Sequence, residues 1–309
     1  MQEFTSLQEC RDRFPSSICT VGNFDGVHRA HCDLLRHITA SARKTGAVSL
    51  LVTFDPHPAR LLHPSQAPAL LTTTRQKLEL VAEQGIAATL VIPFDTDFAA
   101  LSPDRFVREI LVSNLKVRSI YVGPEFFFGK DRQGDVAALR ELARETGPEV
   151  HVLPPLMYQD RPISSSRIRA DLREGKIESV RQMLGRPYFV DGTVIPGRKK
   201  GKEMGFPTAN LSVENEMVPP DGVYATEIVR KGRRYGAVTN IGSRPTFRGA
   251  GHAVETHILD FRETIYGESI RIGFLARLRE EQRFAGGAEL REQIQQDIDA
   301  ARRIHADRE

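Results

Sequence analysis

Short apolar runs alternate with longer amphipathic stretches through the first half of the chain. The apolar runs predict strands at residues 17–22, 48–54, 89–94, 118–122 and 149–153. The stretches between them repeat their apolar residues at helical spacing and predict helices at residues 30–44, 75–84, 103–114 and 136–145. Continuous apolar strands that alternate with helices are typical of a parallel sheet covered on both faces. We therefore expect a doubly wound, Rossmann-like α/β domain.

The pattern changes near Arg186 and Pro187. Two short helices are predicted just before this point, at residues 166–174 and 177–184. Beyond it, short strand-like runs separated by Gly and Pro occur at residues 188–195, 223–229, 234–241, 255–259 and 269–278, and a polar helix at 288–304. Such spacing indicates an antiparallel barrel or sandwich, and we favour a β-barrel with a terminal helix. We predict two domains, residues 1–186 and residues 187–309.

Composition narrows the class of protein. The chain has 309 residues, 40% hydrophobic and 27% charged, with a net charge of only +3, which disfavours both disorder and a large nucleic-acid footprint. No apolar run approaches the roughly 20 residues that span a bilayer, and the N-terminus lacks a signal-peptide pattern. The three cysteines, Cys10, Cys19 and Cys32, cannot all pair within one chain. We expect a cytoplasmic protein with reduced thiols that engages neither membrane nor nucleic acid.

The richest motif of the first half follows the first strand. Ligands of parallel sheets bind beyond the carboxyl ends of the strands, so the loops after residues 21, 53 and 122 are the candidates. The segment 22–31 combines glycines, a helix N-terminus that favours phosphate, and His28 and His31 three residues apart. Both imidazoles could donate hydrogen bonds to phosphate oxygens. A helix cap with two surface histidines, or a metal pair that lacks a third ligand, are the alternatives.

Three further segments fall at the same predicted sheet edge, at residues 53–58, 123–135 and 163–169. The last contains Ser164, Ser165 and Ser166 followed by Arg167 and Arg169 at the start of a helix. Hydroxyl groups, backbone N–H groups and guanidinium charge together suit a triphosphate. The alternative for this segment is a helix cap with a solvated charged face.

In the second half, the segment 197–210 forms a glycine-rich, cationic loop without a Walker A motif. Such a loop can wrap a triphosphate, and Thr208 and Asn210 offer neutral oxygens that suit Mg²⁺. Further on, Glu255 and His257 alternate with apolar neighbours, and Glu255 is a candidate general base. A basic surface loop that touches RNA, and a solvated strand face, are the alternatives.

Taken in order, these motifs resemble a known family. The first half contains GNFDGVHRAH, TFDPHP, GPEFFFGKDRQGD and ISSSRIR, which resemble the adenylyltransferase module of the bacterial bifunctional riboflavin kinase/FAD synthetases, within the nucleotidylyltransferase superfamily. The second half contains GFPTANL, PDGVYA, NIGSRPTF, VETHILDF and FLARLREEQRF, which resemble the riboflavin kinase module. The resemblance implies phosphorylation of riboflavin to FMN by ATP, and transfer of AMP from ATP to FMN with release of pyrophosphate. Riboflavin, FMN, FAD, ATP and ADP are the expected partners, and Mg²⁺ the expected cofactor.

The motifs and the resemblance together give a set of site residues. The catalytic candidates are Glu255, His28 and His31. The ATP-binding candidates are Gly22, Phe24, Asp25, Gly26, Ser164, Ser165, Ser166, Arg169, Gly197, Lys199, Lys202, Gly205, Pro207, Thr208 and Asn210, of which Thr208 and Asn210 are also the metal candidates. The flavin-binding candidates are Phe54, Pro56, His57, Phe126, Phe128, Arg132, Asn240, Arg244 and Thr246.

Departures from the family pattern leave a second interpretation open. Ala30 stands where the family motif normally has Gly, Glu125 where it normally has Asp, and Phe127 where it normally has Arg. The alternative is a riboflavin kinase whose adenylyltransferase domain is weakened or regulatory. A third interpretation, an RNA-binding barrel that uses Lys199, Lys200 and Lys202, is disfavoured by the near-neutral net charge and by Glu255. Weak self-association is left open.

Overall fold

In the computed structural model, which describes residues 1–197, 204–243 and 252–307, the chain forms two compact units. The first unit comprises residues 1–69 and 74–164, and the second comprises residues 70–73 and 165–309. Four of the predicted site residues lie outside the described residues: Lys199, Lys202, Arg244 and Thr246. The boundary predicted at residue 186 concerns the two activities, and it stays a prediction.

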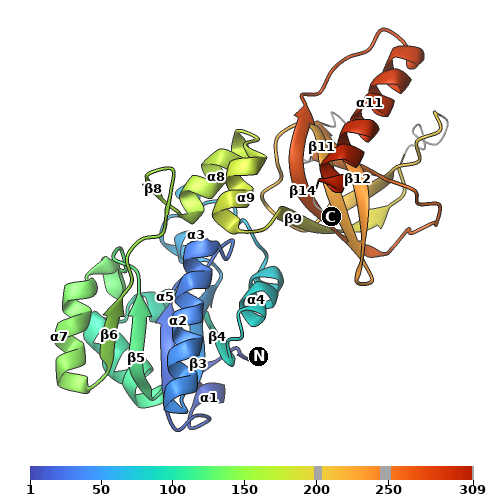
Figure 1. Ribbon diagram of the computed structural model, residues 1–309. Helices are drawn as coiled ribbons and strands as arrows, with labels where there is room; N and C mark the ends of the chain where they lie inside the picture. The colour runs from blue at the N-terminus through green and yellow to red at the C-terminus, as the bar shows by residue number, and fades with distance from the viewer. Residues whose placement is uncertain (198–203, 244–251, 308–309) are drawn as a thin grey trace. The chain divides into compact units, whose positions relative to one another are not determined.

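The first unit is built on a six-stranded sheet in which every neighbouring pair is parallel (Figure 1). Its strands are β1 (Gln2–Phe4), β2 (Ser17–Val21), β3 (Val48–Asp55), β4 (Ala88–Pro93), β5 (Val117–Val122) and β6 (Glu149–Val152), in the order β1-β4-β3-β2-β5-β6. The predicted parallel sheet is confirmed. Strand β1 was not predicted, because three residues with a single buried side chain give no pattern.

Helices connect these strands. They are α1 (Leu7–Cys10), α2 (Arg29–Thr45), α3 (Pro58–Leu62), α4 (Thr74–Glu83), α5 (Thr96–Ala99), α6 (Pro103–Arg105) and α7 (Val136–Thr146). From β2 the chain moves outward to β3 and β4, and then returns to the other side of β2 to form β5 and β6. Right-handed crossovers in opposite directions place their helices on opposite faces of a sheet. This explains why all five residues of β2 are buried.

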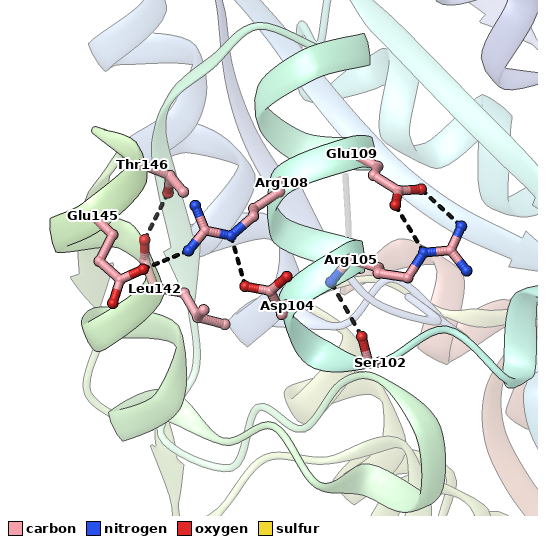
Figure 2. Close-up of polar contacts among 8 residues, drawn as sticks. All are labelled: Ser102, Asp104, Arg105, Arg108, Glu109, Leu142, Glu145 and Thr146. Carbon is pink, nitrogen blue, oxygen red and sulfur yellow. Dashed lines mark hydrogen bonds and ion pairs between the residues drawn. The ribbon is translucent and has the colours of Figure 1, made fainter.

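The helix predicted at residues 103–114 has an unexpected form. After α6 the chain continues as a π-helix, η2 (Phe106–Asn114), which ends where the Leu115 N–H donates to the Ile110 carbonyl 3.0 Å away. Figure 2 shows the exposed side, where Arg108 binds Asp104 at 2.6 Å and also Glu145 of α7. Exposed ion pairs are screened by salt and contribute little. The buried face of η2 therefore holds the segment in place.

The second unit is a closed antiparallel barrel preceded by two helices. Its elements are α8 (Ser165–Arg173), α9 (Ile177–Leu184), β9 (Tyr188–Ile195), β10 (Ala209–Val213), β11 (Gly222–Arg230), β12 (Arg233–Ser243), β13 (His252–Ile258), β14 (Ser269–Arg279) and α11 (Gly287–Ala306). The strand order is β10-β13-β12-β11-β14-β9, and β9 pairs with β10 to close the barrel. The predicted barrel with a terminal helix is confirmed, with β10 as an additional strand.

Alternating burial separates the inside of the barrel from its outer face. Tyr224 and Ile228 of β11 point inward and are fully buried. Val223 and Ala225 point outward and pack against Ile298 of α11, which runs along the outside of the barrel in Figure 1. The barrel therefore has a filled interior, and any ligand site must lie on its outer face or rim.

A short segment from the first half of the sequence belongs to the second unit. The Tyr188 hydroxyl donates to the carbonyl oxygens of Leu71 (3.1 Å) and Met217 (2.8 Å). The Asn215 amide donates to the same Leu71 carbonyl at 3.3 Å. Leu71 is fully buried, so residues 70–73 are part of that core.

None of the helices in the described parts of the chain combines the length and the apolarity needed to cross a membrane.

A chain of buried hydroxyl groups inside the barrel gives a test of this core. Thr239 lies 2.7 Å from the Thr226 hydroxyl and donates to the Thr256 hydroxyl at 2.9 Å, and all three side chains are fully buried. Thr239→Val keeps the shape but takes a partner from both neighbours, so we expect a loss of about 1–3 kcal/mol of unfolding free energy. Thr226→Val takes a partner from one neighbour and should cost less. Denaturant titration checks the order, and equal stability of both variants and the parent would contradict it.

Candidate active sites

The loop that follows β2 lies at the carboxyl end of the strand where the sheet order reverses. Three of its residues adopt left-handed backbone conformations: Phe24 (φ 51°), Gly26 (φ 81°) and Val27 (φ 38°). Glycine accepts this conformation freely, but for a β-branched residue such as Val27 it is strained. Strain of this kind persists only where the surroundings impose it, and it concentrates at functional sites.

The two histidines of this loop come together at the start of α2. His28 caps the helix, and its Nδ1 accepts the His31 backbone N–H at 3.3 Å. The His31 ring is stacked between His28, with centroids 3.6 Å apart, and Phe24, at 4.4 Å. Because Nδ1 of His28 accepts, a neutral His28 carries its proton on Nε2 and can donate from there. The spacing predicted this pairing, while the catalytic role of the pair stays a prediction.

Burial keeps His31 uncharged. Loss of hydration lowers the pKa of His31 well below its usual 6.5, and the nearby His28 and Lys77 lower it further. Its Nδ1 is buried and has no hydrogen-bond partner in the described part of the chain. Buried polar atoms are normally hydrogen-bonded, so this unpaired nitrogen supports His31 as a candidate functional residue.

Sequence reasoning missed Lys77, which α4 places beneath this loop. Its ammonium lies 3.3 Å from the Asn23 carbonyl oxygen, 3.1 Å from the Thr53 hydroxyl and 3.4 Å from the Phe54 carbonyl oxygen. Burial lowers the pKa of Lys77, and the carboxylates of Asp25 and Asp55 partly offset that effect. The sequence signal that could have revealed Lys77 is its helical spacing from the apolar residues of α4.

That spacing places Lys77 on the apolar stripe of α4. Leu80 and Val81, three and four residues further on, are buried on the same side of the helix. A lysine on such a stripe faces the part of the protein against which the helix packs.

The aromatic flavin candidates of the first unit are mostly structural neighbours of the core. Phe128 is 7% exposed and stacks on the half-buried Phe126, with centroids 5.4 Å apart. Phe54 packs edge-on against Phe94 at 5.5 Å. Pro56 follows Asp55 at the end of β3, and His57 caps α3 by accepting the Ala59 N–H. Their contact with flavin stays a prediction.

Arg132 packs on an aromatic ring, and its predicted contact with flavin stays a prediction. Its guanidinium lies over the exposed ring of Phe127, 4.5 Å from the ring centroid. Phe127 is the residue that replaces the arginine typical of the family, so an aromatic–cation pair stands where an additional positive charge was expected.

The serine–arginine segment spans the division between the units. Ser164 ends the first unit, whereas Ser165, Ser166 and Arg169 belong to α8 of the second. Arg169 is 6% exposed. The predicted meeting of this segment with His28 and His31 stays a prediction.

On the barrel, the register aligns three polar residues in one row. Glu255 of β13 lies opposite Asn210 of β10 on one side and Asn240 of β12 on the other. Val254 and Thr256 are buried inside the barrel, whereas Glu255 and His257 are half-buried on the outer face, as the alternation predicted. The row therefore sets one carboxylate between two side-chain amides.

A cavity of about 400 Å³ is lined by Asn210 of this row, but its lining includes neither Glu255 nor Asn240. Four predicted ATP residues line it: Gly197, Pro207, Thr208 and Asn210. A Cβ atom at residue 197 would clash with the Asn210 side-chain amide, so any other residue there would have to displace that amide. His257 holds the Pro207 carbonyl oxygen at 2.8 Å from its Nδ1.

The oxygen donors at this cavity suit a hard cation. Thr208 offers a hydroxyl and Asn210, 5% exposed, an amide oxygen. Among the described residues there is no cluster of His, Cys, Asp and Glu that would suit a transition metal.

Comparison with known proteins identifies both halves of the chain. Family models described as FAD synthetase and riboflavin kinase match residues 11–167 and 184–305. A bifunctional riboflavin kinase/FMN adenylyltransferase of Escherichia coli (strain K12) is 37% identical over 286 residues, covering 92% of this chain and 91% of its own. The relative of the same name from Pseudomonas fluorescens is 36% identical over 307 residues, covering 99% and 98%. A solved structure described as a macrolide-efflux protein from Streptococcus pneumoniae has a TM-score of 0.88 and 26% identity, covering 97% of this chain and 98% of that one.

The neutral state of His31 should make stability depend on pH. Below about pH 6.5 the unfolded chain protonates this imidazole, whereas the folded pKa is lower, so the unfolded state holds more protons. The unfolding free energy should therefore fall toward acid, by at most about 1.4 kcal/mol per pH unit from this group. Denaturant titrations of the parent and His31→Gln between about pH 7.5 and about pH 5 measure the slope. We expect a shallower slope in the variant, and parallel slopes would refute a buried neutral His31.

Proposed function

The chain belongs to the family of bifunctional riboflavin kinase/FMN adenylyltransferases, and from this premise we propose which residues carry out each of its two reactions. The C-terminal kinase domain phosphorylates riboflavin with ATP to give FMN. The N-terminal FAD synthetase domain transfers AMP from ATP to FMN and releases pyrophosphate. We place the boundary between the two activities after residue 186.

For the kinase reaction, we propose Glu255 as the general base. The observation that carries this assignment is the row in which Glu255 lies between Asn210 and Asn240, since Asn210 also lines the cavity to which Thr208 belongs. The 5′-hydroxyl of the ribityl chain attacks the γ-phosphate, and Glu255 accepts its proton. The two amides orient this carboxylate and the hydroxyl, since phosphoryl transfer depends mainly on positioning and charge neutralisation.

The remaining kinase candidates surround the phosphates and the flavin in this proposal. Gly197, Gly205 and Pro207 supply backbone contacts to ATP, and Lys199 and Lys202 supply positive charge. Asn240, Arg244 and Thr246 are assigned to riboflavin. Thr208 and Asn210 would hold Mg²⁺, whose donor preference they match, and the bound ion would neutralise charge on the polyphosphate.

For adenylyl transfer, we propose that the phosphate of FMN attacks the α-phosphate of ATP at the start of α2. His28 donates from Nε2 to a phosphate oxygen, and neutral His31 offers a second ring nitrogen beside it. The free N–H groups of the helix N-terminus favour the same negative charge. Gly22, Phe24, Asp25 and Gly26 of the same loop are assigned to ATP.

Around that centre we assign the outer contacts. Ser164, Ser165, Ser166 and Arg169 clamp the phosphates, and Phe54, Pro56, His57, Phe126, Phe128 and Arg132 bound the flavin. FAD is the bound product. Cytoplasmic location is supported by free thiols at Cys10, Cys19 and Cys32, of which the first two are buried.

Replacement of Glu255 by Gln tests the kinase assignment. We expect riboflavin phosphorylation to fall by about 10²–10⁴-fold, because the hydroxyl loses its proton acceptor. FMN adenylylation should stay nearly intact. Product analysis with riboflavin or FMN, ATP and Mg²⁺ measures the two reactions separately.

A matched control is Glu227→Gln, on β11 of the same barrel and ion-paired to Arg234 rather than placed in the row. This variant should retain both activities. Kinase turnover within a few-fold of the parent in Glu255→Gln would remove Glu255 from the mechanism.

Replacement of Ala30 tests whether the adenylyltransferase domain is fully active or weakened. It is the second residue of α2, where a phosphate would approach the helix start, and its Cβ occupies space that glycine leaves free. We expect Ala30→Gly to raise the rate of FAD formation, to leave the kinase unchanged and to cost up to about 1 kcal/mol of stability. Rates at saturating ATP and Mg²⁺, with melting temperatures, test this. An equal or lower rate would mean that the pocket already accommodates the methyl group.

A further inference from the structure

We propose that Lys77 is a positioning residue for adenylyl transfer, which pins the loop after β2 to the end of β3 through its buried ammonium group. The proposal rests on the proposed role of His28 and His31. It adds a residue on a different helix, outside the motifs, to the adenylyltransferase site.

The pin consists of three hydrogen bonds from Lys77, which join the loop after β2 to the end of β3. The three hydrogens of an ammonium match three oxygens here: the Asn23 carbonyl in the loop, and the Thr53 hydroxyl and Phe54 carbonyl in β3. The Thr53 hydroxyl also donates to the Asn23 carbonyl at 3.2 Å. Asn23 is thus held twice, directly by Lys77 and through Thr53.

The pin acts where the loop needs support. Asn23 immediately precedes Phe24, the first residue in the left-handed conformation, and Phe24 stacks on His31. A strained loop keeps such a conformation only when its neighbours determine it. Fixing the Asn23 carbonyl therefore fixes the Phe24 ring, and through it the imidazole that faces the reaction.

The buried charge is the second argument. Lys77 is 7% exposed, and its hydrogen-bond partners are uncharged oxygens. Burying an ammonium group without a paired carboxylate is costly, and a neutral donor could have served a purely structural role. Asp25 of the loop and Asp55 of β3 act on it from a distance, and His31 of α2 is the third titratable group that faces it. The positive charge instead favours an anionic ligand on the loop.

Lys77→Met and Thr53→Val test the pin. Both keep the shape of the side chain, and each removes one member of the hydrogen-bonded ring. We expect the kcat for FMN adenylylation to fall by about 10–10²-fold in Lys77→Met, because misplacement by about 1 Å has effects of this size. The KM for ATP should change less than kcat. Thr53→Val should lose less, since Lys77 still holds Asn23.

The double variant separates positioning from general destabilisation. Since both changes break the same pin, the double variant should be no slower than Lys77→Met alone. Amide hydrogen exchange in the peptide around residues 22–27 should speed up in both single variants. Lys44→Met, an exposed lysine at the end of α2, is the matched control and should change neither rate nor exchange.

Riboflavin phosphorylation in the same samples reports on the second unit and should stay constant. Lys77→Met with an unchanged kcat, or fully additive losses in the double variant, would overturn the proposal. If Lys77→Met fails to fold, the Thr53→Val variant is sufficient: a normal kcat together with normal amide exchange in its loop would overturn the proposal. A parent enzyme that forms no FAD would overturn the proposed function first, and the role of Lys77 in transfer with it.

Discussion

Parallel pairing of β2 with β3 is the contact on which the first active site depends. In the register of this pair Val21, the last residue of β2, lies beside Val52, so the loop after β2 begins beside the last residues of β3. The loop of Asn23 and the end of β3 at Thr53 are therefore neighbours although they are far apart in sequence. The ends of adjacent strands bring polar groups together at such an edge, and Lys77 then fixes the loop between them.

The barrel depends on register in a different way. Glu255 faces outward between Asn210 and Asn240 only because β13 pairs in this alignment with both β10 and β12. A slip of one residue would turn Glu255 into the filled interior and bring Thr256 out. Such a slip would bury a carboxylate and break the hydroxyl chain to Thr239, so the core itself protects the placement of the proposed base.

Much of this arrangement could be predicted from the sequence, because strong periodicity marks it. The five long strands of the sheet, the helices between them and the outward face of Glu255 follow from apolar spacing. Strand β10 was missed because its burial pattern does not alternate and it follows the glycine-rich segment, and the π-helical form of η2 because its pattern resembles an ordinary helix. Lys77 was missed for another reason: a lysine in an amphipathic helix normally points to water, so its helical spacing from Leu80 and Val81 is a weak signal, and the contacts with Asn23 and Thr53 show its burial.

Both proposed sites must bind polyphosphate, but they place their charged groups differently. In the barrel a carboxylate on an open strand face would take a proton, and the cations assigned there lie in a glycine-rich segment. In the first unit the imidazoles are stacked and His31 is kept neutral by burial, so His31 can donate or accept a hydrogen bond without adding charge. The positive charge of the first unit's site is carried instead by Lys77, whose ammonium group contacts the loop at Asn23. Separating the charge from the hydrogen-bonding groups lets each be positioned by its own contacts, which is what a strained loop with a buried pin provides.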